Sequence, residues 1–287
     1  MHFNMKILKY FVIAVALIIG VTAKDSAAEP KVVASIYPLH ALAAGVMAGV
    51  GTPALLLEGD VSPHDFALKP SQARLLQSAD LIVWVGDGLE YPLARFLQNL
   101  PAGRSLRLTE PGAASGQNLH IWLDPDRAQQ IVSALVNNLS TLDPANAARY
   151  RANGGKLNQR IADLTIELEV QLQPFHGTPY IVFHDAYSHF ERRFGLANRG
   201  TVTPNPERRP GARHIRQMRE TIAASGARCI FREPQFEPQT LAAIVEGSDI
   251  HIGQLDPLGV GLEPGVNGFF HLMRNLAQDF TGCLSRP

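Results

Sequence analysis

The chain has 287 residues, of which 46% are hydrophobic and 18% are charged, so it can bury a sizeable core and is not a disordered protein. Its 26 Lys and Arg residues equal its 26 Asp and Glu residues in number, and only 7% of the residues are aromatic. This composition offers nucleic acid neither electrostatic attraction nor a stacking platform, so we exclude nucleic acid as a partner.

The first residues have the pattern of a secretory signal. Lys6 and Lys9 precede an uncharged apolar run over residues 10–21, and small residues follow at 26–28. As a helix this run would span about 18 Å, which is short of the roughly 30 Å of a bilayer core. We expect a cleavable signal peptide over residues 1–28, with an uncleaved membrane anchor as the alternative. Because no Cys lies near the cut, we expect a periplasmic protein without a lipid anchor.

The next part of the chain, residues 29–142, alternates between strand and helix patterns. Short β-rich apolar runs occur at 32–36 and 81–85, and Pro70 with Ser71 opens a helical stretch between them. Apolar runs of this kind are typical of parallel strands that are buried on both faces. The alternation predicts an N-terminal α/β lobe with a parallel sheet.

A long helix is predicted over residues 143–173. Asp143 can cap a helix and Pro144 fits its first turn, while Pro174 ends the pattern. Apolar residues recur along one stripe of the helix, at positions 150, 157, 161, 164, 168 and 172. The helix is long enough to run along two lobes, and Gly154 with Gly155 is the point where it is expected to be weakest and able to bend.

The remaining residues, 174–287, again alternate between strand and helix patterns, with predicted strands at 180–183, 229–231 and 250–255 and a helix at 212–224. We therefore expect an α/β fold with two parallel-sheet lobes joined by one long helix. The two cysteines of the chain, Cys229 and Cys283, would form one disulfide in an exported protein, or remain two buried thiols.

Signatures of common catalytic sites are absent from the sequence, and histidine is the informative residue. His64, His120 and His184 each follow an apolar or strand-like run and precede a helix start, and Asp256 also ends a predicted strand. The carboxyl ends of parallel strands form the crevice where α/β proteins bind ligands. Imidazoles converging there suit zinc, with copper and nickel as chemical competitors.

Several ordered motifs resemble a known family over almost the whole mature chain, from about Val32 to Cys283. These segments read SPHDFALKPSQARLLQSADLIVWVG, LHIWLDP, YIVFHDAYSHFERRFGL, REPQF, LDPLG and TGCL. They resemble the ZnuA-like periplasmic zinc-binding proteins, the solute receptors of zinc ABC importers. The resemblance implies two four-stranded α/β lobes, a long rigid helix between them, and a metal site in the cleft between the lobes.

Matched motif by motif, the resemblance makes His64, His120 and His184 the metal ligands. Related manganese receptors usually have Glu where this chain has His184, and three nitrogen ligands favour zinc over the harder manganese ion. The fourth ligand would be Asp256 or water, because Pro63 stands where some relatives have a carboxylate beside the first histidine. The resemblance also implies the Cys229–Cys283 disulfide.

The segment before His120 departs from many zinc receptors, since residues 110–119 contain no histidine-rich loop. A second, loop-borne metal site is therefore not expected, and zinc delivery by a periplasmic donor protein is conceivable. Asp65 and Asp185 adjoin two of the proposed ligands and could orient imidazoles, although helix capping and turn formation are the alternative roles.

The function expected from these observations is a high-affinity periplasmic zinc receptor that delivers Zn²⁺, one ion per chain, to the permease of an ABC importer. We expect a monomer and no enzymatic activity. The alternatives are a manganese receptor or a surface adhesin of the same fold, and a zinc hydrolase that uses a three-histidine site.

Overall fold

The computed structural model describes residues 28–110, 118–203, 211–236 and 238–287. The expected signal peptide therefore lies outside the described residues, apart from Ala28, and so does most of the segment over residues 110–119. Within the described ranges, no helix has both the length and the apolar character that a membrane span requires.

The first lobe is built on a four-stranded parallel sheet with the strand order β2-β1-β3-β4. Its two central strands are buried along their whole length, which is why the sequence shows them as apolar runs. The strands are β1 (Val32–Ala34), β2 (Ala54–Leu55), β3 (Leu81–Trp84) and β4 (Ser105–Arg107). The helices are α2 (Tyr37–Met47), α3 (Pro70–Ser78), α4 (Tyr91–Leu97) and α5 (Pro125–Leu142).

The second lobe repeats this topology with a parallel sheet in the order β6-β5-β7-β8. In both sheets, the first strand of the lobe pairs with the second and the third, and the fourth lies at an edge. The strands are β5 (Pro179–His184), β6 (Ala197–Thr203), β7 (Cys229–Arg232) and β8 (His251–Gln254). The helices are α7 (Ser188–Phe194), α8 (Ala212–Ser225), α9 (Pro238–Val245) and α10 (Gly268–Leu284).

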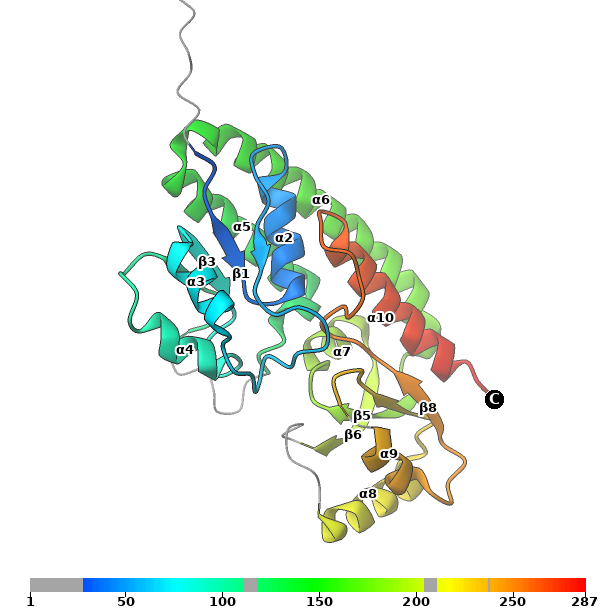
Figure 1. Ribbon diagram of the computed structural model, residues 1–287. Helices are drawn as coiled ribbons and strands as arrows, with labels where there is room; N and C mark the ends of the chain where they lie inside the picture. Colours follow the sequence, from blue (N-terminus) through cyan, green and yellow to red (C-terminus); the bar gives the residue numbers. More distant parts are fainter. Residues whose placement is uncertain (1–27, 111–117, 204–210, 237) are drawn as a thin grey trace, which may run out of the picture.

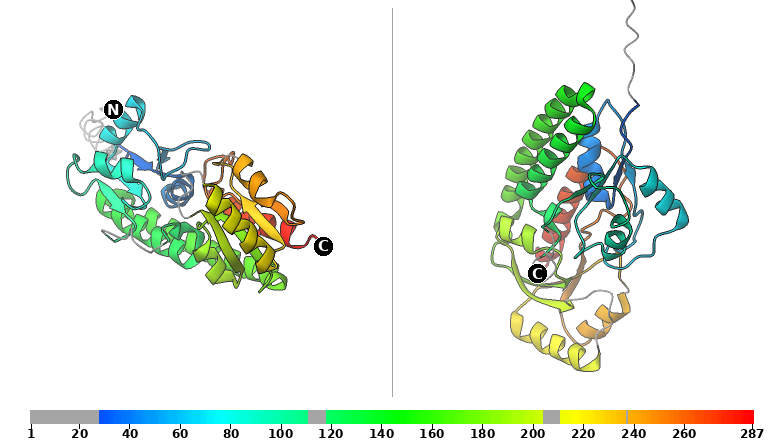
Figure 2. Two further views of the ribbon diagram at one scale, coloured as in Figure 1. Left: turned by 90° about the horizontal axis from the view of Figure 1, so that it is seen from below. Right: turned by 90° about the vertical axis from the view of Figure 1, so that its left-hand side faces the viewer.

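The long helix between the lobes is α6, which runs over Ala147–Leu172. It is preceded by a 3₁₀ turn at Pro144–Asn146, so the α-helix proper begins after the predicted Asp143 start. The helix continues through Gly154 and Gly155 without a break. It lies beside α5 and extends along both lobes (Figures 1 and 2). The predicted architecture of two parallel-sheet lobes joined by a long helix is thus confirmed.

The two lobes are held together by more than α6. The C-terminal helix α10 packs against both α2 and α6, and most of the buried apolar residues of both lobes form one continuous cluster. Hydrogen bonds also join the lobes; for example, Tyr37 Oη donates to the carbonyl of Glu263 at 3.0 Å, and Trp122 Nε1 donates to the carbonyl of Pro257 at 2.8 Å. This shared core fixes the orientation of the two sheet edges that face each other.

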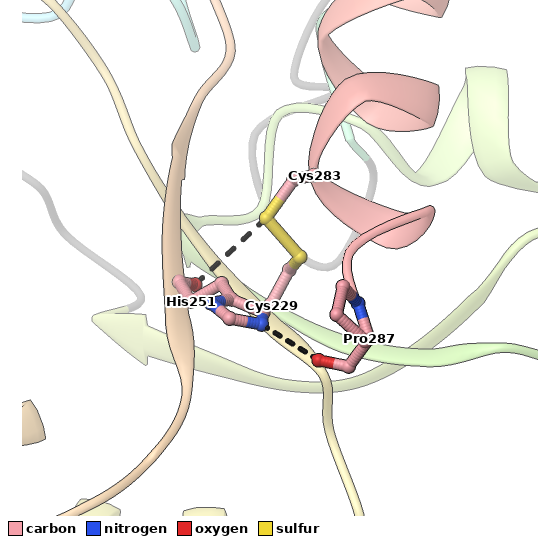
Figure 3. Close-up of a disulfide and its surroundings, with 4 residues drawn as sticks. All are labelled: Cys229, His251, Cys283 and Pro287. Atoms are coloured by element: carbon pink, nitrogen blue, oxygen red, sulfur yellow. Dashed lines mark hydrogen bonds between the residues drawn. A yellow bond between two sulfur atoms is a disulfide. The ribbon is translucent and has the colours of Figure 1, made fainter.

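The predicted disulfide is present and joins β7 to α10 through Cys229 and Cys283, with 6.2 Å between their Cα atoms (Figure 3). Next to it, the His251 ring bonds the carbonyl of the C-terminal Pro287 at 3.0 Å. The disulfide therefore attaches the last helix of the chain to the central part of the second sheet.

Candidate metal centre

Each of the three histidines lies at the carboxyl end of a strand or in the connection that follows one. His64 lies in the connection between β2 and α3, and His184 is the last residue of β5. His120 directly precedes a 3₁₀ turn (η1, Ile121–Leu123) that leads into α5. Asp124 caps α5 by accepting a hydrogen bond from the Asp126 N–H at 2.9 Å, which fixes the short link between His120 and the helix.

The structure brings these three side chains together, although they are far apart in the sequence. One ring nitrogen from each of His64, His120 and His184 lies within 4.8 Å of the other two. The ring centroids are 5.4 Å apart for His64 and His120, 5.5 Å for His64 and His184, and 5.1 Å for His120 and His184. Two ligands come from the first lobe and one from the second, so the cluster sits between the lobes.

Hydrogen bonds on the outer side of two rings fix their tautomers. His120 Nδ1 lies 2.9 Å from Asn118 Oδ1, and His184 Nδ1 lies 2.6 Å from Glu233 Oε1. Each Nδ1–H donates to its oxygen, which leaves the Nε2 lone pair of both rings directed at the centre of the cluster. The Nε2 atom of His64 is also buried and finds no hydrogen-bond partner within the described part of the chain.

The spacing of the ring nitrogens suits a tetrahedral ion. Nε2 of His120 and Nε2 of His184 are 3.3 Å apart, with both Nδ1 protons engaged elsewhere. Two nitrogens at about 2.0 Å from a zinc ion and at a tetrahedral angle would be separated by about 3.3 Å. The two lone pairs repel each other until a cation lies between them, so this arrangement favours a bound metal ion.

Burial keeps the rings of His64 and His120 in the neutral form that ligates metals. Desolvation, helped by the nearby His184, lowers the pKa of His64 to about 4. Desolvation and the neighbouring histidines also hold the pKa of His120 well below its usual value. Burial raises the pKa of Glu233, and its contact with His184 opposes that shift. A metal ion can therefore bind near neutral pH without first displacing protons from His64 and His120.

The space around the cluster is small. A cavity of about 10 Å³ is lined by the three histidines and by Ser62, Pro63, Glu233, Gln235, Phe236, Pro257 and Leu258. This volume holds about one water-sized particle, which is enough for a metal ion but not for an organic substrate.

The structure does not bring Asp256 into the cluster. No carboxylate joins the three ring nitrogens within the described residues. Asp256 Oδ1 accepts from the Leu258 N–H at 3.0 Å and from Gln235 Nε2 at 3.1 Å, while its other oxygen accepts from the Val260 N–H. These bonds hold the turn after β8, so a role of Asp256 as the fourth ligand stays a prediction.

Asp65 and Asp185 do not hydrogen-bond to the imidazoles of the cluster. Asp65 is exposed, and Asp185 accepts hydrogen bonds from Asn118. The residues whose side chains hydrogen-bond to the rings are Glu233 and Asn118. Both lie inside or next to motifs that carried the family resemblance, REPQF and LHIWLDP, but only the folded chain places them against the rings.

Comparisons with known proteins agree with this fold. The family model described as "Zinc-uptake complex component A periplasmic" (ZnuA) matches residues 32–283. The "High-affinity zinc uptake system protein ZnuA" of Brucella suis biovar 1 (strain 1330) is 34% identical over 334 aligned positions, covering 98% of this chain and 100% of the relative. The protein of the same name from Paracoccus denitrificans (strain Pd 1222) is 34% identical over 317 positions, covering 95% and 97%.

A solved crystal structure of ZnuA has the same fold, with a TM-score of 0.78 and 24% sequence identity, covering 89% of this chain and 99% of that chain. These relatives are named as components of uptake systems, not as enzymes. The family model and the full-length relatives show that the chain belongs to the ZnuA family of periplasmic zinc-uptake components.

Proposed function

We propose that the protein is a zinc receptor that binds one Zn²⁺ per chain through His64, His120 and His184. The observation that carries this proposal is the convergence of three imidazoles between the lobes, with those of His120 and His184 buried and that of His64 half-buried. The zinc ion is the cargo of the receptor. The names of the relatives, zinc uptake system proteins, support the same reading.

The donor set favours zinc over manganese, because manganese prefers oxygen ligands and all three converging groups are nitrogens. A hydrolytic role for the same three-histidine site is disfavoured, since the cavity at the cluster has a volume of only about 10 Å³. Water or Asp256 would complete the coordination sphere. Asp256 could do so only by giving up hydrogen bonds that hold its own turn.

The receptor would pass its zinc ion to the permease of an ABC importer, as the family to which it belongs implies. We further propose export to the periplasm through the signal peptide over residues 1–28, a monomeric state, and loading by a periplasmic donor protein. The short segment over residues 110–119, without histidines, supports a donor because it supplies no second metal site.

A competitive metal titration of the demetallated protein tests the function. Calorimetry is expected to give one tight zinc ion per chain, and an equal concentration of manganese is not expected to displace it. Two tight zinc ions, or displacement by manganese, would contradict the proposal. The zinc form is expected neither to hydrolyse esters nor to hydrate carbon dioxide. Measurable turnover of either substrate would favour the hydrolase instead.

The fourth ligand is tested by Asp256→Asn and Asp256→Ala. If Asp256 ligates zinc, Asp256→Asn is expected to weaken zinc binding appreciably, because the carboxylate reduces the charge of the site. If both variants bind zinc within a factor of two of the wild type, water is the fourth ligand, and the role of Asp256 is to stabilise the turn that follows β8.

A further inference from the structure

Asn118 links the two lobes at the metal cluster. Its Oδ1 accepts from the backbone N–H of His120 at 2.9 Å and also lies 2.9 Å from His120 Nδ1. Its Nδ2 donates to the backbone carbonyl of Asp185 at 2.7 Å and to Asp185 Oδ1 at 3.0 Å. Asp185 directly follows His184, so one amide side chain joins the segments that carry a ligand from each lobe.

The chemistry of the partners determines which way the amide points. The backbone N–H of His120 can only donate, and the carbonyl of Asp185 can only accept. Asn118 must therefore present its oxygen to His120 and its nitrogen to Asp185. Because that oxygen only accepts, His120 Nδ1 has to carry the proton, and the lone pair of His120 remains on Nε2, the atom that faces His184.

A second contact reinforces this link. His189, on α7 of the second lobe, donates from Nε2 to the backbone carbonyl of Asn118 at 2.8 Å. Its Nδ1 in turn accepts from Arg192 at 2.9 Å, which fixes the tautomer that makes the donation possible. Both the main chain and the side chain of Asn118 are thus bonded to the second lobe.

We propose that Asn118 is a positioning residue of the receptor, which holds His120 in the metal-ligating tautomer and fixes its distance from His184 across the two lobes. The inference rests on the proposed zinc-binding function. Without the amide, the His120 ring can place its proton on either nitrogen, and the two ligand-bearing segments lose their direct connection. Substitution of groups that orient metal-bound histidines typically weakens metal binding by about 10- to 100-fold.

The test compares Asn118→Ala with Asn118→Asp and with a matched control, Asn137→Ala, whose side chain is exposed on α5 away from the cluster. Zinc affinity is measured by competition with a chromophoric chelator. Asn118→Ala is expected to weaken zinc binding at least about 10-fold, whereas Asn137→Ala is expected to match the wild type. Thermal unfolding of each demetallated variant reports whether the fold is retained.

Nitrogen-15 spectra of the histidine rings in the demetallated proteins separate positioning from a general structural effect. The wild type and Asn118→Asp are expected to show the Nδ1–H tautomer of His120, since both keep an acceptor oxygen, and Asn118→Ala is expected to lose it. Unchanged zinc affinity in Asn118→Ala, or a single Nδ1–H tautomer in that variant, would overturn the inference alone. Failure of the wild type to bind zinc would instead overturn the proposed function and this inference with it.

Discussion

At the scale of single residues, the proposed site depends on side chains contributed by both lobes. His184, at the end of β5, is the proposed ligand from the second lobe, and its ring contacts Glu233. Its nitrogen is 3.3 Å from that of His120, so neither lobe alone can complete the cluster. This division means that removing one side chain tests the whole arrangement.

We predict that His184→Ala weakens zinc binding by at least about 100-fold, because one of three or four coordination bonds is lost. Unfolding of the variant is expected to remain cooperative. The matched control is His271→Ala, because the His271 side chain on α10 is exposed, and this variant should bind zinc like the wild type. Chelator competition gives both affinities, and wild-type affinity in His184→Ala would show that His184 is not the third ligand.

A second residue-scale prediction concerns Glu90, which is fully buried in the first lobe. Its carboxyl group accepts from the Val85 N–H at 2.8 Å and the Gly86 N–H at 3.0 Å and contacts the Ser35 hydroxyl. Burial nevertheless raises its pKa from 4.5 to about 7. The folded protein therefore keeps this proton at pH values where the unfolded chain has released it.

The sign of the effect follows from proton binding. Because the pKa of Glu90 is raised on folding, its protonated carboxyl group contributes fully to the free energy of unfolding below about pH 4.5. This contribution, of up to about 3 kcal/mol, is lost as the pH rises to about 7. Glu90→Gln mimics the protonated form and cannot ionise, so its free energy of unfolding should fall less than that of the wild type between pH 5 and 8. Urea unfolding at both pH values measures this, and parallel pH profiles would contradict it.

At the scale of elements, the glycine pair in α6 does not act as one flexible point. Gly154 is buried against α5, and a Cβ atom there would lie 2.4 Å from a methyl carbon of Val136. Gly155 is exposed and has no atom within 4 Å of such a Cβ. The first glycine permits close packing of two helices, and the second only weakens the helix.

We therefore predict opposite effects for two neighbouring substitutions. Gly155→Ala should raise the free energy of unfolding by about 1 kcal/mol, because Ala has the higher helix propensity. Gly154→Ala should lower it by about 1 kcal/mol or more, because the clash with Val136 outweighs that gain. Urea unfolding of the two variants side by side is the measurement, and shifts in the same direction would refute the packing argument.

At the scale of the whole molecule, the lobes do not behave as independent bodies on one tether. The helix α10 of the second lobe packs on α2 and α6. In addition, Arg274 on α10 forms a bidentate ion pair with Glu167 on α6, with both hydrogen bonds at 2.7 Å. A shared apolar cluster continues beneath these contacts. The site between the lobes is accordingly held at nearly fixed spacing by the fold itself.

The disulfide contributes to the stability of this assembly as a whole. Cys229 and Cys283 are separated by 54 positions, and closing a loop of that length stabilises the folded state by about 4 kcal/mol in the chain-entropy model. We predict that reduction, or the double variant Cys229→Ala with Cys283→Ala, lowers the urea midpoint accordingly. Equal midpoints for the oxidised and reduced proteins would show that the loop constraint is not stabilising.

The elements that could be predicted from the sequence are those whose signals are local. The central strands β1, β3, β5 and β7 are buried on both faces, so each appears as an apolar run that the sequence reveals. The stripe of α6 and the histidines beyond strand ends are also readable without coordinates. The edge strands β2, β4 and β6 were not predicted, because they are short or half-exposed and show no apolar run.

The tertiary structure was needed to show which polar groups reach the site. Asp65, Asp185 and Asp256 are carboxylates beside promising positions, yet the side chains that hydrogen-bond to the rings are those of Glu233 and Asn118. A side chain's role is set by the partners that the fold brings within hydrogen-bond reach, and Glu233 meets His184 across 49 positions of sequence. Asp256 meets backbone N–H groups of its own turn instead. Local sequence fixes which chemical groups are available, and long-range packing fixes which of them meet.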